Sequence, residues 1–129
     1  MLTPEQLARR VAKEGEVPGT VVIEAERVSA EGDVVCDDEA LSAAAGAQRV
    51  VAVMDHLDGE GRPRLVTSCG GAASARGMVQ RVVTPLGVID ITREGLIVRE
   101  VAPGISAREV QAKTEPPLLA GPDLAAVEG

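Results

Sequence analysis

Hydrophobic residues along this chain fall mostly into short runs and alternations, the spacing expected of strands rather than of long helices. Strands are predicted at residues 20–27, 48–54, 80–84, 87–92 and 96–101, with shorter extended segments at 34–36 and 62–67. The apolar run within residues 48–54 has no polar interruption, which is typical of a strand covered on both faces in a parallel sheet. The last three strands follow one another closely and are therefore expected to pair antiparallel.

Three helices are predicted from their capping signals. They cover residues 3–15, 37–47 and 106–113. Thr3 and Gln6 have the spacing of a capping box, Asp37 or Asp38 can cap the middle helix, and Ser106 can cap the last. No repeat or long linker divides the chain, so we expect one domain. Its parts are an N-terminal helix at 1–15, a connector at 16–19, a core at 20–115 and an extended tail at 116–129 that frays at its end.

The composition narrows the possible partners. The 129 residues include no Phe, Tyr or Trp, which excludes aromatic stacking on bases and aromatic cages for cations. Thirteen Lys and Arg against 20 Asp and Glu leave a net charge of −7, which repels phosphate backbones. No apolar run approaches the roughly 18 residues of a membrane span, and the N-terminal segment does not resemble a signal peptide. We therefore expect no nucleic-acid or membrane partner and a cytoplasmic location.

Three stretches of the chain follow the pattern of a known family. Residues 28–33 read V-S-A-E-G-D, residues 46–56 read G-A-Q-R-V-V-A-V-M-D-H, and residues 69–104 run from C-G-G through R-V-V-T and V-I-D-I-T to V-A-P-G. In order and spacing they resemble V-[SD]-x-x-G-[DN], G-A-K-[RK]-V-I-V-A-M-E-H and the C-T-L-P-L-T to E-I-A-P-G stretch in the B subunit of the family I 3-oxoacid CoA-transferases. The resemblance implies an α/β fold. Its sheet would be open and mostly parallel like the CoA-transferase core, trimmed to fewer strands, with antiparallel hairpin strands.

The same resemblance implies a reaction. Family members move CoA from an acyl-CoA to a 3-oxo or other short carboxylic acid, and a glutamate carboxylate in an S-E-N-G-[LIVM] turn attacks the thioester. A coenzyme A ester is thus the implied substrate, and no covalently bound cofactor is expected. Because family members work as paired A and B halves, the implied partner is a CoA-transferase A-type chain or, in a homo-oligomer, a further copy of this chain.

Two parts of the family pattern are missing or changed in this sequence. No S-E-N-G occurs, because the segment that would carry it is reduced to a few residues between Gly15 and Thr20. Residues 38–42 read D-E-A-L-S where the family has G-G-A-M-D. Two carboxylates there replace two glycines, and they would repel a carboxylate substrate.

Glu24 and His56 are two candidate site residues. Glu24 ends the first predicted strand and is a weak candidate for a replacement nucleophile. The alternative is a solvated strand residue, as most carboxylates are, and the resemblance places Glu24 opposite a family glycine. His56 follows a strand predicted to be buried, where α/β proteins place ligand-facing side chains. As the sole histidine it supports neither a triad nor a metal site, and a structural hydrogen-bonding role is its alternative.

Cys69, Gly70 and Gly71 are candidates for a substrate cleft, as a thiol beside backbone donors. The alternative is a half-buried loop residue, because no base partner is visible. The two glycines lack the spacing of either phosphate-binding fingerprint. The acidic residues 37–39 could hold a hard cation, but carboxylates at a helix start normally act as caps, so no metal is expected.

Two hypotheses for function follow. In the first, the chain is an enzyme subunit whose missing carboxylate comes from a partner chain. In the second, it is a non-catalytic scaffold or partner-binding remnant of a CoA-transferase. The changes at two separate parts of the family site favour the second hypothesis for the isolated chain.

Overall fold

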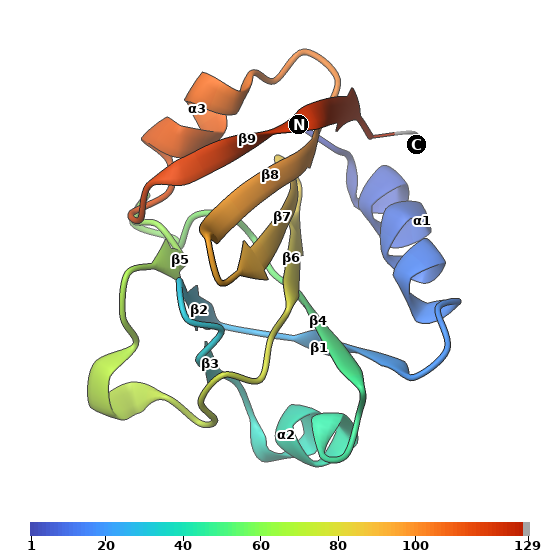
Figure 1. Cartoon of the computed structure of the whole chain (residues 1–129), viewed down its shortest axis with the longest axis vertical. Coiled ribbons are helices and arrows are strands. Elements are labelled where there is room, and N and C mark those ends of the chain that lie inside the picture. Colours follow the sequence, from blue (N-terminus) through green and yellow to red (C-terminus); the bar gives the residue numbers. More distant parts are fainter. Residues whose placement is uncertain (128–129) are drawn as a thin grey trace.

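The computed structural model describes residues 1–127, with the side chains of all of these except residues 121–123 (Figure 1). The elements in chain order are α1 (Pro4–Gly15), β1 (Thr20–Glu24), β2 (Arg27–Ser29), β3 (Val34–Val35), α2 (Asp38–Ala44), β4 (Arg49–Val53), β5 (Leu65–Val66), the 3-10 turn η1 (Gly70–Ala72), β6 (Arg81–Thr84), β7 (Gly87–Thr92), β8 (Gly95–Val101), α3 (Ala107–Ala112) and β9 (Leu118–Ala126).

A six-stranded sheet in the order β1-β4-β6-β7-β8-β9 forms the centre of the fold. β1, β4 and β6 are parallel neighbours, β6, β7 and β8 form an antiparallel meander, and β9 returns parallel to β8. A second small sheet has the order β3-β2-β5. The α/β class, the mostly parallel open sheet and the antiparallel strands are therefore confirmed.

The predicted first helix is confirmed with its capping box. The Thr3 side chain accepts from the backbone N–H of Gln6, and the Gln6 side chain accepts from the backbone N–H of Thr3. The middle helix is capped by Asp37 as predicted but ends at Ala44 rather than 47. The backbone turns extended at Ala45, which ends the helix despite the high helix propensity of the alanines.

Two other sequence predictions were wrong in detail. The strand predicted at 20–27 is two strands, because the backbone N–H of Ala25 still bonds to Val53 whereas that of Glu26 bonds to Val35, in the second sheet. The tail predicted to be extended from residue 116 and frayed at its end is a paired strand, β9, as far as Ala126. It forms because β8 has an open edge, and only residues 128–129 of that tail lie outside the described part of the chain.

The core is built from aliphatic side chains on both faces of the sheet. On one face, Val51, Val83 and Val88 pack against Leu7 and Val11 of α1. The opposite face carries the larger cluster, which includes residues of α2, α3 and the small sheet. Within the described part of the chain, no helix is both long and apolar enough to cross a membrane.

Candidate functional site

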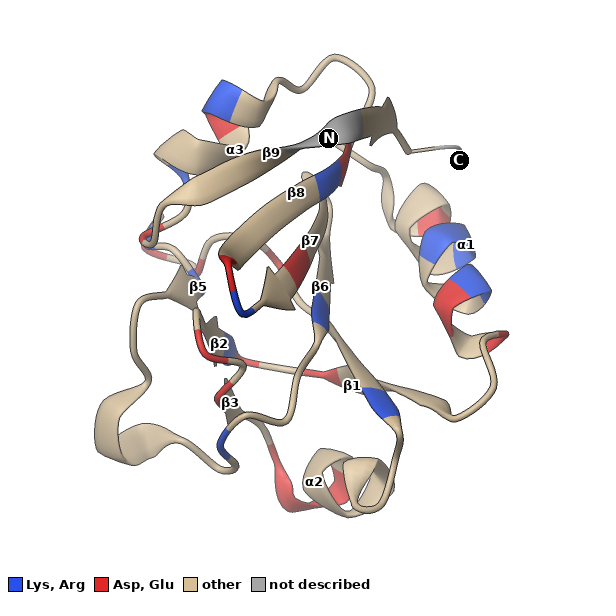
Figure 2. Cartoon of the chain, in the orientation of Figure 1, with Lys and Arg blue, Asp and Glu red and all other residues tan. Residues whose placement is uncertain are grey.

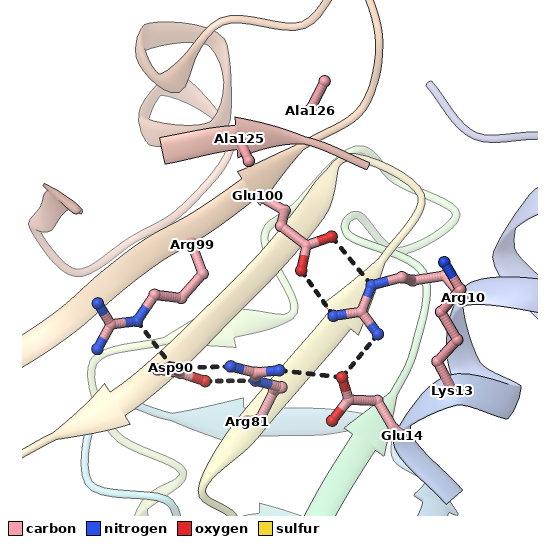
Figure 3. A pocket seen from close by; sticks show the side chains of 9 residues that line it. All are labelled: Arg10, Lys13, Glu14, Arg81, Asp90, Arg99, Glu100, Ala125 and Ala126. Atoms are coloured by element: carbon pink, nitrogen blue, oxygen red, sulfur yellow. Dashed lines mark hydrogen bonds and ion pairs between the residues drawn. The ribbon is translucent and has the colours of Figure 1, made fainter. Parts of the chain in front are cut away.

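A network of buried and half-buried ion pairs joins α1 to the sheet, and Figure 3 shows all of its members except Arg49. It joins side chains from α1, β4, β6, β7 and β8. Its members are Arg10, Glu14, Arg49, Arg81, Asp90, Arg99 and Glu100.

Glu14 lies at the centre of this network with a residue exposure of 4%. Its carboxylate accepts from Arg10 at 2.6 Å, from Arg49 at 2.7 Å and from Arg81 at 2.9 Å, so that both oxygens are occupied. Burial by itself raises the pKa of Glu14, but hydrogen bonds from Arg49 and Arg10 and the charge of Arg81 outweigh it and lower the pKa below its usual value. Glu14 is therefore held as an anion and is fully engaged.

Asp90 is held in the same way on the sheet. It lies directly opposite Arg81 in the β6–β7 pair and accepts two hydrogen bonds from that guanidinium and a third from Arg99 at 2.9 Å. Burial raises the pKa of Asp90, but the two arginines outweigh burial and lower it, and the Asp90 hydrogen bond raises the pKa of Arg81. Both carboxylate oxygens of Glu100 accept a hydrogen bond from the Arg10 guanidinium, at 3.0 and 2.7 Å. These pairs fix α1 to three strands.

A cavity of about 710 Å³ opens over this network. Its charged lining residues are Arg10, Lys13, Glu14, Arg81, Asp90, Arg99 and Glu100. The three carboxylates all accept hydrogen bonds from arginines, and a carboxylate engaged in this way is a poor nucleophile. The ion pairs beneath the cavity hold α1 against the sheet, and the carboxylates that line the cavity are all engaged, so none is free for acyl transfer.

Sequence reasoning missed this network, although two of its contacts have local signals. Arg10 and Glu14 are four residues apart on a predicted helix, the spacing of a stabilising pair. Arg81 and Asp90 face each other across a predicted hairpin. The contact between α1 and the sheet joins residues that are distant in sequence and has no such signal.

His56 is buried among hydrogen-bonding threonines, with 4% of its surface exposed. Its Nδ1 lies 2.8 Å from Thr84 Oγ1, and its Nε2 lies 2.8 Å from Thr114 Oγ1. Because the Thr114 hydroxyl donates to the carbonyl of Val110, it accepts from His56, which places the imidazole proton on Nε2. Thr84 then donates to Nδ1. Both ring nitrogens are satisfied by the neutral imidazole, the geometry of a structural group.

Burial lowers the pKa of His56 to about 4, and the positive charge of Lys113 acts in the same direction. The ring lines a hollow of about 350 Å³ with Met1, Leu57 and Leu86 among its neighbours. Cys69, Gly70 and Gly71 do not line this hollow. The substrate-cleft candidates proposed from the sequence therefore do not share that hollow.

Cys69 is buried, and its thiol donates to the carbonyl oxygen of Asp33 at 3.7 Å. Burial raises the pKa of Cys69, and the Asp33 carboxylate raises it further. Gly70 and Gly71 lie in the exposed turn η1 with open space where a side chain would begin. The raised pKa keeps the Cys69 thiol protonated near neutral pH, and the turn beside it is open.

At pH 7.5 we expect Ellman's reagent to label native Cys36 at least tenfold faster than Cys69. Cys36 is partly exposed whereas Cys69 is buried, although burial raises both thiol pKa values. The variants Cys36→Ser and Cys69→Ser assign the two rates, and unfolding in urea should make them equal. Fast labelling of native Cys69 would mean that the thiol is reactive.

Glu24 is exposed at the carboxyl end of β1. It lines a hollow of about 270 Å³ together with Val22, Ile23, Asp37, Glu39, Ala40 and Ala43. Asp37 accepts from the backbone N–H of Ala40 at 2.8 Å, which is the capping role. In the described part of the chain no group of three or more His, Cys, Asp or Glu side chains could hold a metal ion.

Two carboxylates are buried among the described residues, Glu14 and Asp33. Asp33 accepts from the backbone N–H of Gly77 at 2.9 Å and lies 3.6 Å from the Arg76 guanidinium. Both buried carboxylates are therefore engaged by fixed donors, and neither is placed to attack a thioester.

No protein-family model matches the chain, but curated relatives do. It is 36% identical over 90 residues to the B subunit of 3-oxoadipate CoA-transferase from Pseudomonas putida, a match covering 70% of this chain and 42% of the relative. The B subunit of a probable succinyl-CoA:3-ketoacid coenzyme A transferase from Bacillus subtilis is 30% identical over 70 residues, covering 54% and 32%. The chain spans less than half the length of these relatives.

Solved structures share the fold. The acyl-CoA transferase YdiF of Escherichia coli O157:H7 matches with a TM-score of 0.71 at 13% identity, covering 96% of this chain and 30% of that one. The decarboxylase AibA/AibB matches with a TM-score of 0.65 at 19% identity, covering 97% and 56%. Glutaconate CoA-transferase of Acidaminococcus fermentans matches with 0.60 at 13%, covering 96% and 59%.

Proposed function

Because the chain belongs to the family of CoA-transferase B subunits, we propose that it is a B-type partner chain that transfers no CoA on its own. The observation that carries this proposal is the state of its carboxylates. Glu14 and Asp33 are buried and engaged, and the exposed Glu24 lies beside two further carboxylates, Asp37 and Glu39. A thioester substrate that carries its own carboxylate would be repelled at that position.

The partner in this proposal is a CoA-transferase A-type chain. The relatives are named as B subunits, which supports a two-chain assembly. A coenzyme A ester would be a substrate of the assembly rather than a cofactor held by this chain. The free state of Cys36 and Cys69 supports a cytoplasmic location, where thiols stay reduced.

We expect the purified chain to form no succinyl-CoA from acetoacetyl-CoA and succinate, and to bind a CoA-transferase A-type chain in a pull-down or by gel filtration. Binding with transfer that Glu24→Gln leaves intact would place the nucleophile on the partner, and binding without transfer would make the chain a scaffold. Either result agrees with the proposal.

Two results would overturn the proposal. One is transfer by the chain alone that Glu24→Gln abolishes, since the nucleophile would then be present. The other is a chain that binds no A-type partner. Glu16→Gln is the matched control, because Glu16 is an exposed carboxylate at the end of α1, away from the hollow that Glu24 lines.

A further inference from the structure

Within residues 1–127, the part of the chain that the structure describes, β1 is an edge strand whose outer side has no neighbouring strand. In the six-stranded sheet it pairs only with β4. The backbone N–H of Ala25 donates to Val53, and the carbonyl of Gly19 accepts from Arg49. Since alternate residues of a parallel strand bond to the same side, the backbone groups of Val21 and Ile23 face β4. Those of Val22 and Glu24 therefore face outward.

The outward side of β1 has few of the features that protect sheet edges. Edges are usually blunted by proline, by inward-pointing charge or by a bulge. The sequence of β1 is T-V-V-I-E, its pairing with β4 is regular, and its one charge is at its end. Unpaired N–H and C=O groups on a regular β-branched strand are a template for an added strand.

The hollow lined by Glu24 runs along this edge, between β1 and α2. Small or aliphatic side chains from both elements form its apolar part, and three carboxylates lie around it. The apolar residues are Val22, Ile23, Ala40 and Ala43, and the acidic ones are Glu24, Asp37 and Glu39. Figure 2 shows acidic residues in the segment that enters α2. The volume of about 270 Å³ suits a few side chains of an extended segment rather than a whole domain.

We propose that the outer edge of β1 binds an extended, lysine- or arginine-rich segment of a partner protein, which adds to the sheet as a further strand. Backbone hydrogen bonds to Val22 and Glu24 would hold the segment, and its cations would face Glu24, Asp37 and Glu39. Charge complementarity selects this occupant over a second copy of the chain. Two copies would bring the same acidic groups together, and each carries a net charge of −7.

The test uses two nine-residue peptides as probes, one alternating lysine with valine and one alternating glutamate with valine. Fluorescence anisotropy with the full chain should show binding of the lysine peptide at least tenfold tighter than of the glutamate peptide. Hydrogen exchange should slow at the amides of Val22 and Glu24 when the lysine peptide is added. The amides of Val21 and Ile23 should already be slow, because they bond to β4.

Val22→Pro removes an outward N–H without removing a hydrogen bond to β4. This variant should therefore bind the lysine peptide at least tenfold more weakly than the wild type does. Val22→Thr keeps the N–H and the branched side chain and is the matched control. If Val22→Pro does not fold, Glu39→Lys tests the same site, because it reverses one exposed charge and should weaken the lysine peptide severalfold.

Equal binding of the two peptides, or binding without protection of Val22 and Glu24, would overturn the proposal. Self-association of the chain that Val22→Pro abolishes would also overturn it, because the edge would then serve a second copy. The proposal does not depend on CoA-transferase membership. A chain that fails to bind an A-type partner would leave these peptide results unchanged.

Discussion

Replacing Glu14 by glutamine is expected to lower the free energy of unfolding by about 3–5 kcal/mol, the loss seen when one partner of a buried ion pair is removed. Glutamine has one acceptor oxygen and no charge, so the contacts to Arg10, Arg49 and Arg81 would weaken together, although Arg10 keeps Glu100 and Arg81 keeps Asp90 as partners. Small domains are stable by about 5–15 kcal/mol, which makes this the most damaging single change we foresee. Urea unfolding followed by far-UV circular dichroism measures it, because no tyrosine or tryptophan is present for fluorescence.

Glu16→Gln is the control for this experiment. Glu16 follows α1 and is exposed, so its replacement should change the free energy of unfolding by less than about 0.5 kcal/mol. Similar losses in the two variants would contradict the central role of Glu14. A loss confined to Glu14→Gln would show that the network fastens α1 to the sheet.

Acidification from pH 6.5 towards 4 is expected to destabilise the fold by about 3 kcal/mol through His56 alone. The folded-state pKa of about 4 lies below the unfolded value of 6.5, so the unfolded chain takes up the proton first as the pH falls. The contribution of His56 is complete above pH 6.5 and disappears on the way down to pH 4. A pKa difference of about 2.5 corresponds to about 3 kcal/mol.

His56→Gln separates this effect from that of the carboxylates. Glu14 and Asp90 have lowered pKa values, so their contribution is present above the usual carboxylate pKa and is lost only at lower pH. Between pH 6.5 and 5 the wild type should lose stability while His56→Gln should stay nearly level. Parallel pH profiles for the two proteins would mean that the pKa of His56 is the same in the folded and unfolded chain, which would contradict the lowered pKa.

Most elements of the fold could be predicted from local pattern. The hairpin β6–β7 and the capping box at Thr3 depend on residues close in sequence, and both were found. The division of the first predicted strand into two has no local signal. Ala25 and Glu26 are neighbours whose backbone N–H groups bond to different, distant strands. β9 was missed for a related reason. Its proline- and alanine-containing sequence is a weak strand signal, and it is held by the open edge of β8.

The polar interior was less predictable than the strands. The sequence indicates His56 as a candidate site residue or a structural hydrogen-bonding group, but it does not predict the threonine partners, which lie 28 and 58 residues further along the chain. The local sequence places Glu14 in a helix but does not predict its partners Arg49 and Arg81, because they lie on strands whose order in the sheet depends on the whole fold. Ion pairs between distant elements can be predicted only when the order of the strands is known, whereas strands and helix caps can be predicted from local sequence.

The two ends of the described chain meet in one small apolar cluster. Leu2 and Val127 are buried there with Ala102, and the backbone N–H of Leu2 donates to Pro85 at 2.7 Å while that of Val127 donates to Val101 at 2.8 Å. Leu2 and Val127 are almost the whole described chain apart in sequence, so forming this cluster closes a very long loop and has a high cost in loop-closure entropy. It should form late in folding, and stretching the molecule from its two ends would load α1 and β9 first and leave the parallel strands β1 and β4 shielded.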